Sequence, residues 1–392
     1  MCVFTNPGIC SVMPVADVAS LEGTGTYTLS SAEHSFAKKN SGEGRSGLHE
    51  AVCAMIGVIA SPPTAGLAAS GEMPSPSAPG CFFSEELRRA KTAVPVYLMN
   101  LPLSLSAQVA NNAWMDEMSA VDREVRPASA ISQFLELYRH ISGQAIVYLL
   151  PSRPGLQDQP YVANLAAVLP HCHEDTVLIS RFRASARARE SAVGTEFFRL
   201  MEFSVHEMPE AVGGSEAFFE GEADLKHVHG NVYVGGYGLR TSLNALEWTA
   251  ERFGMRIIPY RITDPYLYHL DCCVLRLTND AMLVCTSLAE PGFLRELEKH
   301  CQIIDVTLDE ARAGITNSLV LADQILCDTD IGLLDEGNRQ YAVERAKIRR
   351  LEEICGRLGR SLHTFCLSEF YKSGALLSCL VLPVRHASAD SL

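Results

Sequence analysis

From about residue 92 onward, short apolar runs recur along the chain, separated by amphipathic segments of helical period. Their lengths and their aliphatic and β-branched content are typical of buried strands. The runs are Val94–Met99, Ala145–Leu150, Thr176–Ser180, Val232–Gly235, Met255–Tyr260, Cys273–Leu277, Ala281–Cys285, Gln302–Asp305, Ser318–Leu321, Gln324–Cys327 and Ser378–Val384. The pattern therefore predicts many short strands.

Three segments between these runs predict helices. Ser242–Phe253 carries apolar residues at helical spacing and is followed by Gly254, a residue typical of helix ends. Gly292–Cys301 and the charged segment Gly337–Leu358 have a similar pattern. Strands that alternate with helices predict an α/β fold. Hairpin-like pairs, such as 273–277 with 281–285, argue against a plain doubly wound sheet.

The first 91 residues have a different composition. Ile56–Gly80 holds five prolines, many small residues and a single charge, Glu72. Such a segment offers little apolar surface to bury, so we expect residues 1–91 to be a mostly disordered extension. We expect one domain at residues 92–387.

The composition of the chain argues against some classes of binding partner and favours one kind of cellular compartment. The 392 residues carry a net charge of −13, which argues against nucleic acid or an anionic membrane as the main partner. No apolar run is long enough to span a bilayer. The 13 cysteines are odd in number and form no CxxC pair, which favours a reducing compartment. We expect a cytoplasmic protein, with an organelle left open by the extension.

The candidate chemistry centres on a cysteine near the C-terminus. Cys379 follows a glycine-containing bend in the run Ser368–Pro383, and Tyr268–Cys272 supplies His269 and Asp271. A thiol with a histidine and carboxylates from distant segments is the set of groups used in nucleophilic catalysis. If 268–272 is a strand, alternation places His269 and Asp271 on one face.

Six segments in a fixed order then point to a family. They are Asn112–Met115, Val162–Asn164 with Leu178–Arg183, Phe219–Asp224, Gly235–Ser242, Tyr268–Asp271 and the run around Cys379. Together, over residues 92–387, the chain resembles the guanidine-modifying superfamily, which comprises arginine deiminases, amidinotransferases and dimethylarginine dimethylaminohydrolases. The resemblance implies a pentein fold, a five-bladed, pseudo-symmetric α/β propeller.

Within this superfamily, the chain is most similar to the arginine dihydrolases. Deiminases usually carry an aspartate in the second blade, where this sequence has Asn164. Two segments depart from the family pattern: the turn 373–377 before the cysteine, and Glu222-Ala223 in the carboxylate turn. These departures leave the choice of substrate open.

The resemblance also implies roles for individual residues. Cys379 attacks the guanidino carbon, and His269 protonates the leaving amine and then activates water. The groups expected to hold the substrate are Glu220 and Asp271 on the guanidinium, Asn112 and Asn164 as neutral partners, Arg181 and Arg240 on the α-carboxylate, and Asp224 nearby. The implied substrate is arginine-like, and the resemblance implies no metal and no cofactor.

Three functions remain open at this point. The first is hydrolysis of a linear amidine, most of all arginine to ornithine, ammonia and carbon dioxide, with deiminase-type hydrolysis of arginine or dimethylarginine as its alternative. The second is transfer of the amidino group to an amine. The third is a binding module that has lost catalysis. We interpret His171–Glu174 and His227–His229 as loop or strand-edge residues, because neither has a second pair at metal spacing. Gly337–Leu358 is a candidate subunit contact, so a homo-oligomer stays open.

Overall fold

The computed structural model describes residues 2–6, 9–12 and 94–385. The chain divides into two units, Met1–Ala93 and Val94–Leu392. In the first unit, β1 (Cys2–Asn6) pairs antiparallel with β2 (Ile9–Val12). Apart from this hairpin, the disorder predicted for residues 1–91 concerns residues outside the described ranges.

The second unit contains five three-stranded sheets within residues 94–385. In every sheet the middle strand pairs antiparallel with the first strand and parallel with the third. The sheets, in strand order, are β19 (Leu382–Arg385), β3 (Val96–Asn100), β4 (Ile146–Leu150); β5 (Ala166–Val168), β6 (Thr176–Ile179), β7 (Ser204–Glu207); β10 (Leu225–His229), β11 (Val232–Tyr237), β12 (Arg256–Arg261); β13 (Val274–Arg276), β14 (Ala281–Val284), β15 (Gln302–Asp305); and β16 (Leu319–Leu321), β17 (Gln324–Asp328), β18 (Ser361–Phe365).

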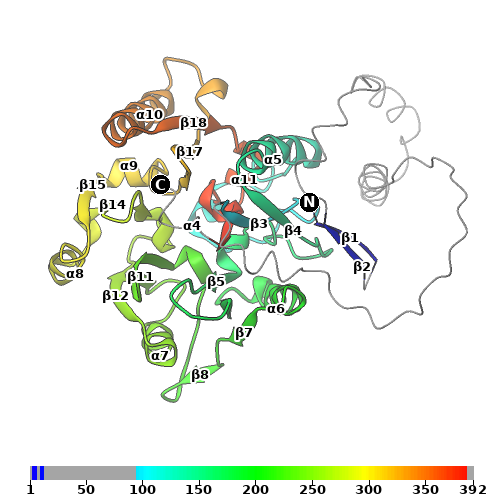
Figure 1. Ribbon diagram of the computed structural model, residues 1–392. Helices are drawn as coiled ribbons and strands as arrows, with labels where there is room; N and C mark the ends of the chain where they lie inside the picture. The colour runs from blue at the N-terminus through cyan, green and yellow to red at the C-terminus, as the bar shows by residue number, and fades with distance from the viewer. Residues whose placement is uncertain (1, 7–8, 13–93, 386–392) are drawn as a thin grey trace, which may run out of the picture. The chain divides into compact units, whose positions relative to one another are not determined.

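A helix connects the middle strand to the third strand in each sheet, because parallel neighbours need a crossover connection. These helices are α5 (Pro127–Ser142), α6 (Glu190–Leu200), α7 (Leu243–Phe253), α8 (Pro291–Leu297) and α10 (Arg339–Leu358), which Figure 1 shows around the outside of this unit. The same strand–strand–helix–strand module therefore occurs five times. The first module is completed by the C-terminal strand β19, which pairs with β3.

A short turn precedes the first strand of each module. In four modules this turn is a 3₁₀ helix: η3 (Val162–Asn164), η5 (Gly221–Ala223), η6 (Leu270–Cys272) and η9 (Ser378–Leu380). η3 contacts both η5 and η9. The approach of η5 to η3 needs glycine, because Gly221 has φ +65° and a Cβ there would lie 2.7 Å from the Ala163 carbonyl oxygen. The turns thus bring residues from distant segments together.

Several predicted elements are confirmed, and others need correction. Helix α7 ends at Gly254, which is left-handed as expected. The predicted strand Ser378–Val384 is wrong at its start, where η9 replaces it until β19 begins at Leu382. The 268–272 segment is likewise a turn and no strand, because Leu270 N–H donates to the Asp224 carboxylate. The predicted helix 292–301 ends early, at Leu297.

Candidate active site

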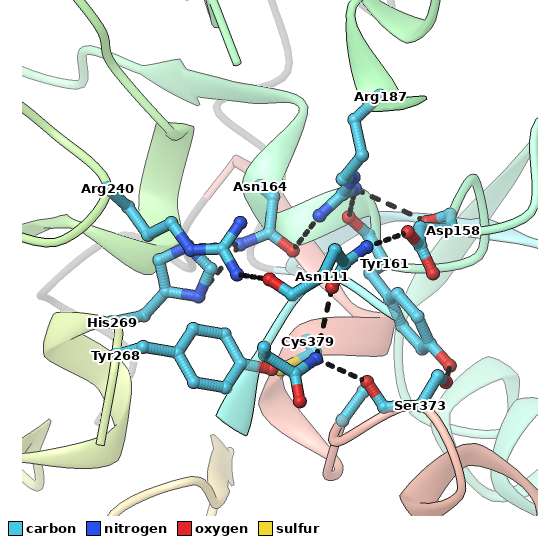
Figure 2. Close-up of a pocket in the computed structure, with 12 residues that line it drawn as sticks. Asn111, Asp158, Tyr161, Asn164, Arg187, Arg240, Tyr268, His269, Ser373 and Cys379 are labelled. Atoms are coloured by element: carbon cyan, nitrogen blue, oxygen red, sulfur yellow. Dashed lines mark hydrogen bonds between the residues drawn. The ribbon is translucent and has the colours of Figure 1, made fainter. Parts of the chain in front are cut away.

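A pocket lies beside the turns that precede the first strands (Figure 2). Its lining residues are Asn111, Asn112, Asp158, Tyr161, Asn164, Arg187, Arg240, Tyr268, His269, Ser373, Ala375 and Cys379. Five residues predicted from the sequence are among them: Asn112, Asn164, Arg240, His269 and Cys379. The structure therefore brings the predicted nucleophile and the predicted acid/base to one cavity.

Cys379 lies in η9 with its thiol between two polar groups. Its Sγ lies 3.6 Å from Asn317 Nδ2 and 3.9 Å from Asp271 Oδ2. Asp271 is fixed by a 2.7 Å hydrogen bond from Ser378 Oγ. Burial raises the pKa of the Cys379 thiol to about 12, and the Asp271 charge adds to the shift. This shift favours the protonated thiol, and a cation beside Sγ would favour the thiolate.

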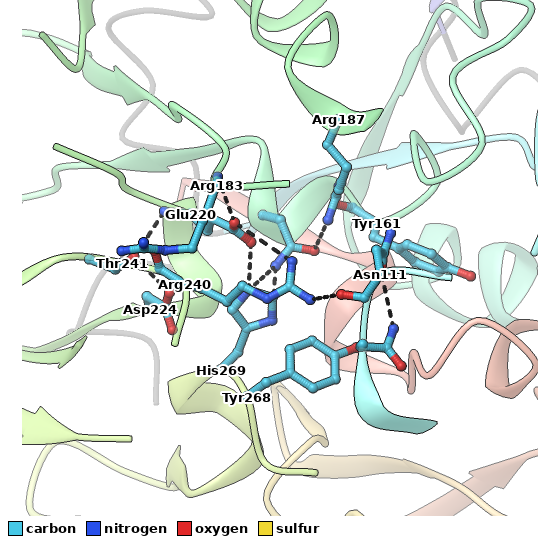
Figure 3. Close-up of polar contacts among 12 residues, drawn as sticks. Asn111, Tyr161, Arg183, Arg187, Glu220, Asp224, Arg240, Thr241, Tyr268 and His269 are labelled. Atoms are coloured by element: carbon cyan, nitrogen blue, oxygen red, sulfur yellow. Dashed lines mark hydrogen bonds and ion pairs between the residues drawn. The ribbon is translucent and has the colours of Figure 1, made fainter. Parts of the chain in front are cut away.

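His269 is oriented by a buried carboxylate (Figure 3). Its Nε2 lies 2.8 Å from Glu220 Oε2, and Arg183 N–H donates to Glu220 Oε1 at 3.1 Å. Burial opposes ionisation of Glu220, but the His269 hydrogen bond and the nearby arginines outweigh it and lower its pKa to about 2. An ionised carboxylate only accepts hydrogen bonds, so Nε2 carries a proton and Nδ1 remains for chemistry.

None of the three predicted carboxylates is among the residues that line the pocket. Glu220 was expected to hold the guanidinium, but its contact is with His269. Asp224 accepts from Thr241 Oγ at 2.6 Å and from Leu270 N–H at 3.0 Å, so it holds the turn that carries His269. Burial raises the pKa of Asp224 to about 6. Asp271 is the carboxylate that approaches the thiol.

Only one of the two predicted arginines lines the pocket. Arg240 lines the pocket, with its guanidinium 4.9 Å from the Tyr268 ring centroid. Arg181 does not line it, because its Nη1 donates to the Ala217 carbonyl at 2.7 Å and its guanidinium packs on Phe218. A different arginine, Arg187, takes a place in the pocket wall.

Arg187 fixes the orientation of Asn164. Its Nη1 donates to Asn164 Oδ1 at 2.9 Å, and Glu190 anchors it through a 2.7 Å ion pair. A guanidinium has only donors, so the amide oxygen must face Arg187. Asn164 Nδ2 therefore faces His269, 3.4 Å from each ring nitrogen. The asparagine presents a donor, not an acceptor, on this side.

Comparison with known proteins settles the family. The model for eukaryotic N,N-dimethylarginine dimethylhydrolase matches residues 102–332. The chain belongs to this family. The guanidine-modifying superfamily predicted from the sequence is thereby confirmed, and arginine dihydrolases are among the similar proteins.

Relatives of this dimethylarginine dimethylhydrolase family member differ in length. An uncharacterised Caenorhabditis elegans protein, ZK1307.1, is 27% identical over 305 residues, covering 76% of this chain and 98% of its own. The Nostoc bifunctional arginine dihydrolase/ornithine cyclodeaminase AgrE is 30% identical over 300 residues. The match covers 76% of this chain but only 38% of AgrE.

Solved structures show the same fold. The product-bound N-terminal domain of ArgZ, a cyanobacterial arginine dihydrolase, superposes with a TM-score of 0.63 at 24% identity, covering 74% of this chain and 97% of that one. A dimethylarginine dimethylaminohydrolase adduct with S-methyl-L-thiocitrulline gives a TM-score of 0.54 at 17% identity, covering 74% and 99%. The α/β fold predicted from the sequence is thus similar to that of these enzymes.

In this family member, further pocket residues hold the turn that leads to the cysteine. Tyr161 hydrogen-bonds Ser373 Oγ, and Tyr268 donates to the Gly374 carbonyl at 2.7 Å. Asn112 Nδ2 donates to the Ser373 carbonyl at 2.9 Å. The sequence reasoning missed both tyrosines, although Tyr268 is adjacent to His269.

Asp158 and Arg187 were also missed. Asp158 accepts from Asn111 Nδ2 at 2.6 Å, and burial raises its pKa. Both residues lie in polar stretches that resemble a solvent-exposed surface. The weak available signal was the i, i+3 pair of Arg187 with Glu190.

The histidine pairs contact protein groups. His171 Nδ1 lies 2.8 Å from the Tyr233 hydroxyl, and His227 Nε2 lies 2.9 Å from the Gly230 carbonyl oxygen. Across residues 94–385 and the short N-terminal hairpin, no cluster of three or more His, Cys, Asp or Glu side chains is placed to hold a metal ion. In the same residues, no helix has the length and hydrophobicity of a membrane span.

Proposed function

We propose that the chain hydrolyses L-arginine to ornithine, ammonia and carbon dioxide through a covalent intermediate on Cys379. The observation that carries this proposal is the grouping of Cys379, Asp271 and the His269–Glu220 pair around the pocket, with the Asn164 amide N–H₂ beside His269. The family match supports chemistry on a guanidino carbon–nitrogen bond.

The first half of the reaction uses the charge of the substrate. A guanidinium held near Asp271 is a cation next to Cys379, so it favours the thiolate that burial otherwise disfavours. His269 Nδ1 takes the thiol proton as Sγ bonds to the guanidino carbon, and it gives this proton to the departing ammonia when the carbon–nitrogen bond breaks. His269 next takes a proton from water, which adds to the thiouronium carbon. The carbon–sulfur bond breaks and leaves a ureido product.

The orientation of Asn164 supports a second round on that product. A donor facing the reacting carbon suits a ureido oxygen, which accepts, better than a guanidinium, which only donates. The neutral amide also adds no charge that would hold the guanidinium more tightly than the ureido group. A second attack by Cys379, followed by water, releases the second ammonia and then carbon dioxide and ornithine.

The pocket also contains groups that match the α-carboxylate and α-ammonium groups of an amino acid. Arg240 is a guanidinium fork suited to an α-carboxylate, and Asp158 is a carboxylate suited to an α-ammonium. Both side chains line the same pocket as Cys379. This pairing of opposite charges supports an amino acid substrate that carries its guanidino group at the far end.

We infer that residues 92–387 form the catalytic domain and that its five modules close into a ring. The return of β19 to pair with β3 supports closure, because it joins the C-terminal segment to the first module. Residues 1–91 are then not part of the catalytic domain, and we infer a cytoplasmic protein, with an organelle left open by this extension.

Incubation of the purified full-length protein with L-arginine tests this function. The proposal predicts ornithine with two ammonia per arginine, and loss of both products in Cys379→Ser. Citrulline with one ammonia per arginine would show that the protein is a deiminase and not a dihydrolase. Absence of turnover by the folded protein would contradict the proposal.

The family match favours a second candidate, hydrolysis of N,N-dimethylarginine to citrulline and dimethylamine. The same residues would act, with dimethylamine as the leaving group. A parallel assay with dimethylarginine distinguishes the two, since dimethylamine formed faster than ornithine would favour this candidate.

A further inference from the structure

Four modules supply groups to the site from the turn before their first strand, and the fifth module has such a turn as well. Asn164 lies in η3, Glu220 caps η5, Asp271 lies in η6 and Cys379 lies in η9. The module of β16–β18 is preceded by Thr316, Asn317 and Ser318, all fully buried. A buried asparagine at the equivalent place needs an explanation, because its amide must find partners.

The partners of Asn317 are the nucleophile and its neighbour. Ser378 N–H donates to Asn317 Oδ1 at 2.9 Å, which fixes the amide so that Nδ2 faces Cys379 Sγ at 3.6 Å. The thiol proton has two acceptors, Asp271 Oδ2 and the Oδ1 of the same Asn317 amide, each 3.9 Å from Sγ. The protonated thiol can therefore donate to these oxygens, whereas a thiolate accepts from Nδ2 without any movement of the asparagine.

We propose that Asn317 is a catalytic residue that stabilises the Cys379 thiolate through its Nδ2 donor. Asp271 has the opposite effect on the thiolate, since a carboxylate close to sulfur disfavours a second negative charge. The amide donor acts against this effect. A hydrogen bond to a charged group is among the stronger ones in proteins. This proposal rests on the proposed function only for the identity of the nucleophile.

Other ionisable groups face the same sulfur from several elements. Asp271, Cys272 and Tyr268 do so from the η6 segment, Lys226 from β10, and Tyr161 from the segment before η3, while His269 and Arg240 share the pocket wall. A change at Asn317 leaves all of them in place. Its effect on the thiol therefore reports on the amide itself.

The pH dependence of Cys379 alkylation by iodoacetamide tests the proposal in the full-length protein. The rate at Cys379 is followed by mass spectrometry of its peptide, which requires no turnover. Asn317→Ser removes the Nδ2 donor to sulfur without adding a charge. We expect alkylation at pH 8 to slow by about tenfold or more and the pH profile to move upward.

Asn338→Ser, at the exposed N-cap of α10, makes the same chemical change far from the pocket and should leave alkylation at the wild-type rate. If Asn317→Ser does not fold, as judged by thermal melting, Asn317→Asp replaces it, which keeps the acceptor for Ser378 N–H but adds a carboxylate beside the sulfur. A folded Asn317 variant with the wild-type profile overturns the proposal. Arginine turnover is measured separately, so an inactive wild type with an Asn317-dependent thiol would refute the proposed function alone.

Discussion

Two buried groups of charges in this molecule have opposite balances. Around the pocket, Glu220 is surrounded by His269, Arg240 and Arg187, and these donors and cations lower its pKa to about 2 despite burial. Under helix α10, Lys347 faces Glu344 at 3.0 Å with Asp328 close by, and there burial raises the pKa of Asp328 to about 6. The one lysine does not offset the effect of burial on the pKa of Asp328.

The contrast shows that buried charge alone does not mark an active site. Lys347 is only 1% exposed, yet neither it nor its carboxylate partners line the pocket. The His269–Glu220 pair is equally buried but has one partner at the pocket surface. We therefore expect substitutions in the first group to change catalysis more than stability, and substitutions in the second to do the reverse.

Glu220→Gln should have the largest effect on turnover. The amide cannot stabilise a protonated His269 as a carboxylate does, and it can turn its own donor toward the ring. We expect kcat to fall by about 10³-fold or more, with little change in melting temperature. Steady-state kinetics beside Glu216→Gln, an exposed carboxylate, measures this. A kcat within threefold of wild type would remove Glu220 from the mechanism.

Lys347→Met should give the complementary result. Removing the cation leaves Glu344 and Asp328 buried without compensation, so we expect a loss of about 3–5 kcal/mol in the free energy of unfolding. Urea titration measures this loss, with Arg345→Met on the exposed side of the same helix as the control. Specific activity at low temperature should be retained. Strong loss of activity in a folded Lys347→Met protein would contradict the claim that the Lys347 group affects stability rather than catalysis.

Asn164→Asp should have a smaller effect on rate but change the product. The new carboxylate would pair with Arg187 and present an acceptor beside His269, which suits a guanidinium better than a ureido group. We expect arginine consumption within about tenfold of wild type, with citrulline accumulating in place of ornithine. Measuring citrulline and ornithine over time tests this expectation, with Asn338→Asp as the control. Unchanged ornithine formation would mean that Asn164 does not control the second round.

The sequence predicted the apolar strands and part of the site, and the reasons for the rest are physical. Strand β10 was missed because Lys226 and His227 interrupt its apolar pattern, although it pairs with β11 on both sides of a register shift between His227 and His229. The hydrogen bond between Glu220 and His269 could not be predicted from local pattern, because it joins residues 49 positions apart. Local pattern identifies residue types at a site, whereas the partner of each group depends on how the turns of different modules meet.

The most direct test of the account is covalent labelling of the full-length protein with 2-chloroacetamidine, a thiol reagent that carries an amidinium. Peptide mapping by mass spectrometry then locates the modified cysteines. The account predicts rapid modification of Cys379, slowed by L-arginine, with the other cysteines little changed. Modification spread evenly over the cysteines, or an unmodified Cys379, would contradict the assignment of Cys379 as the nucleophile.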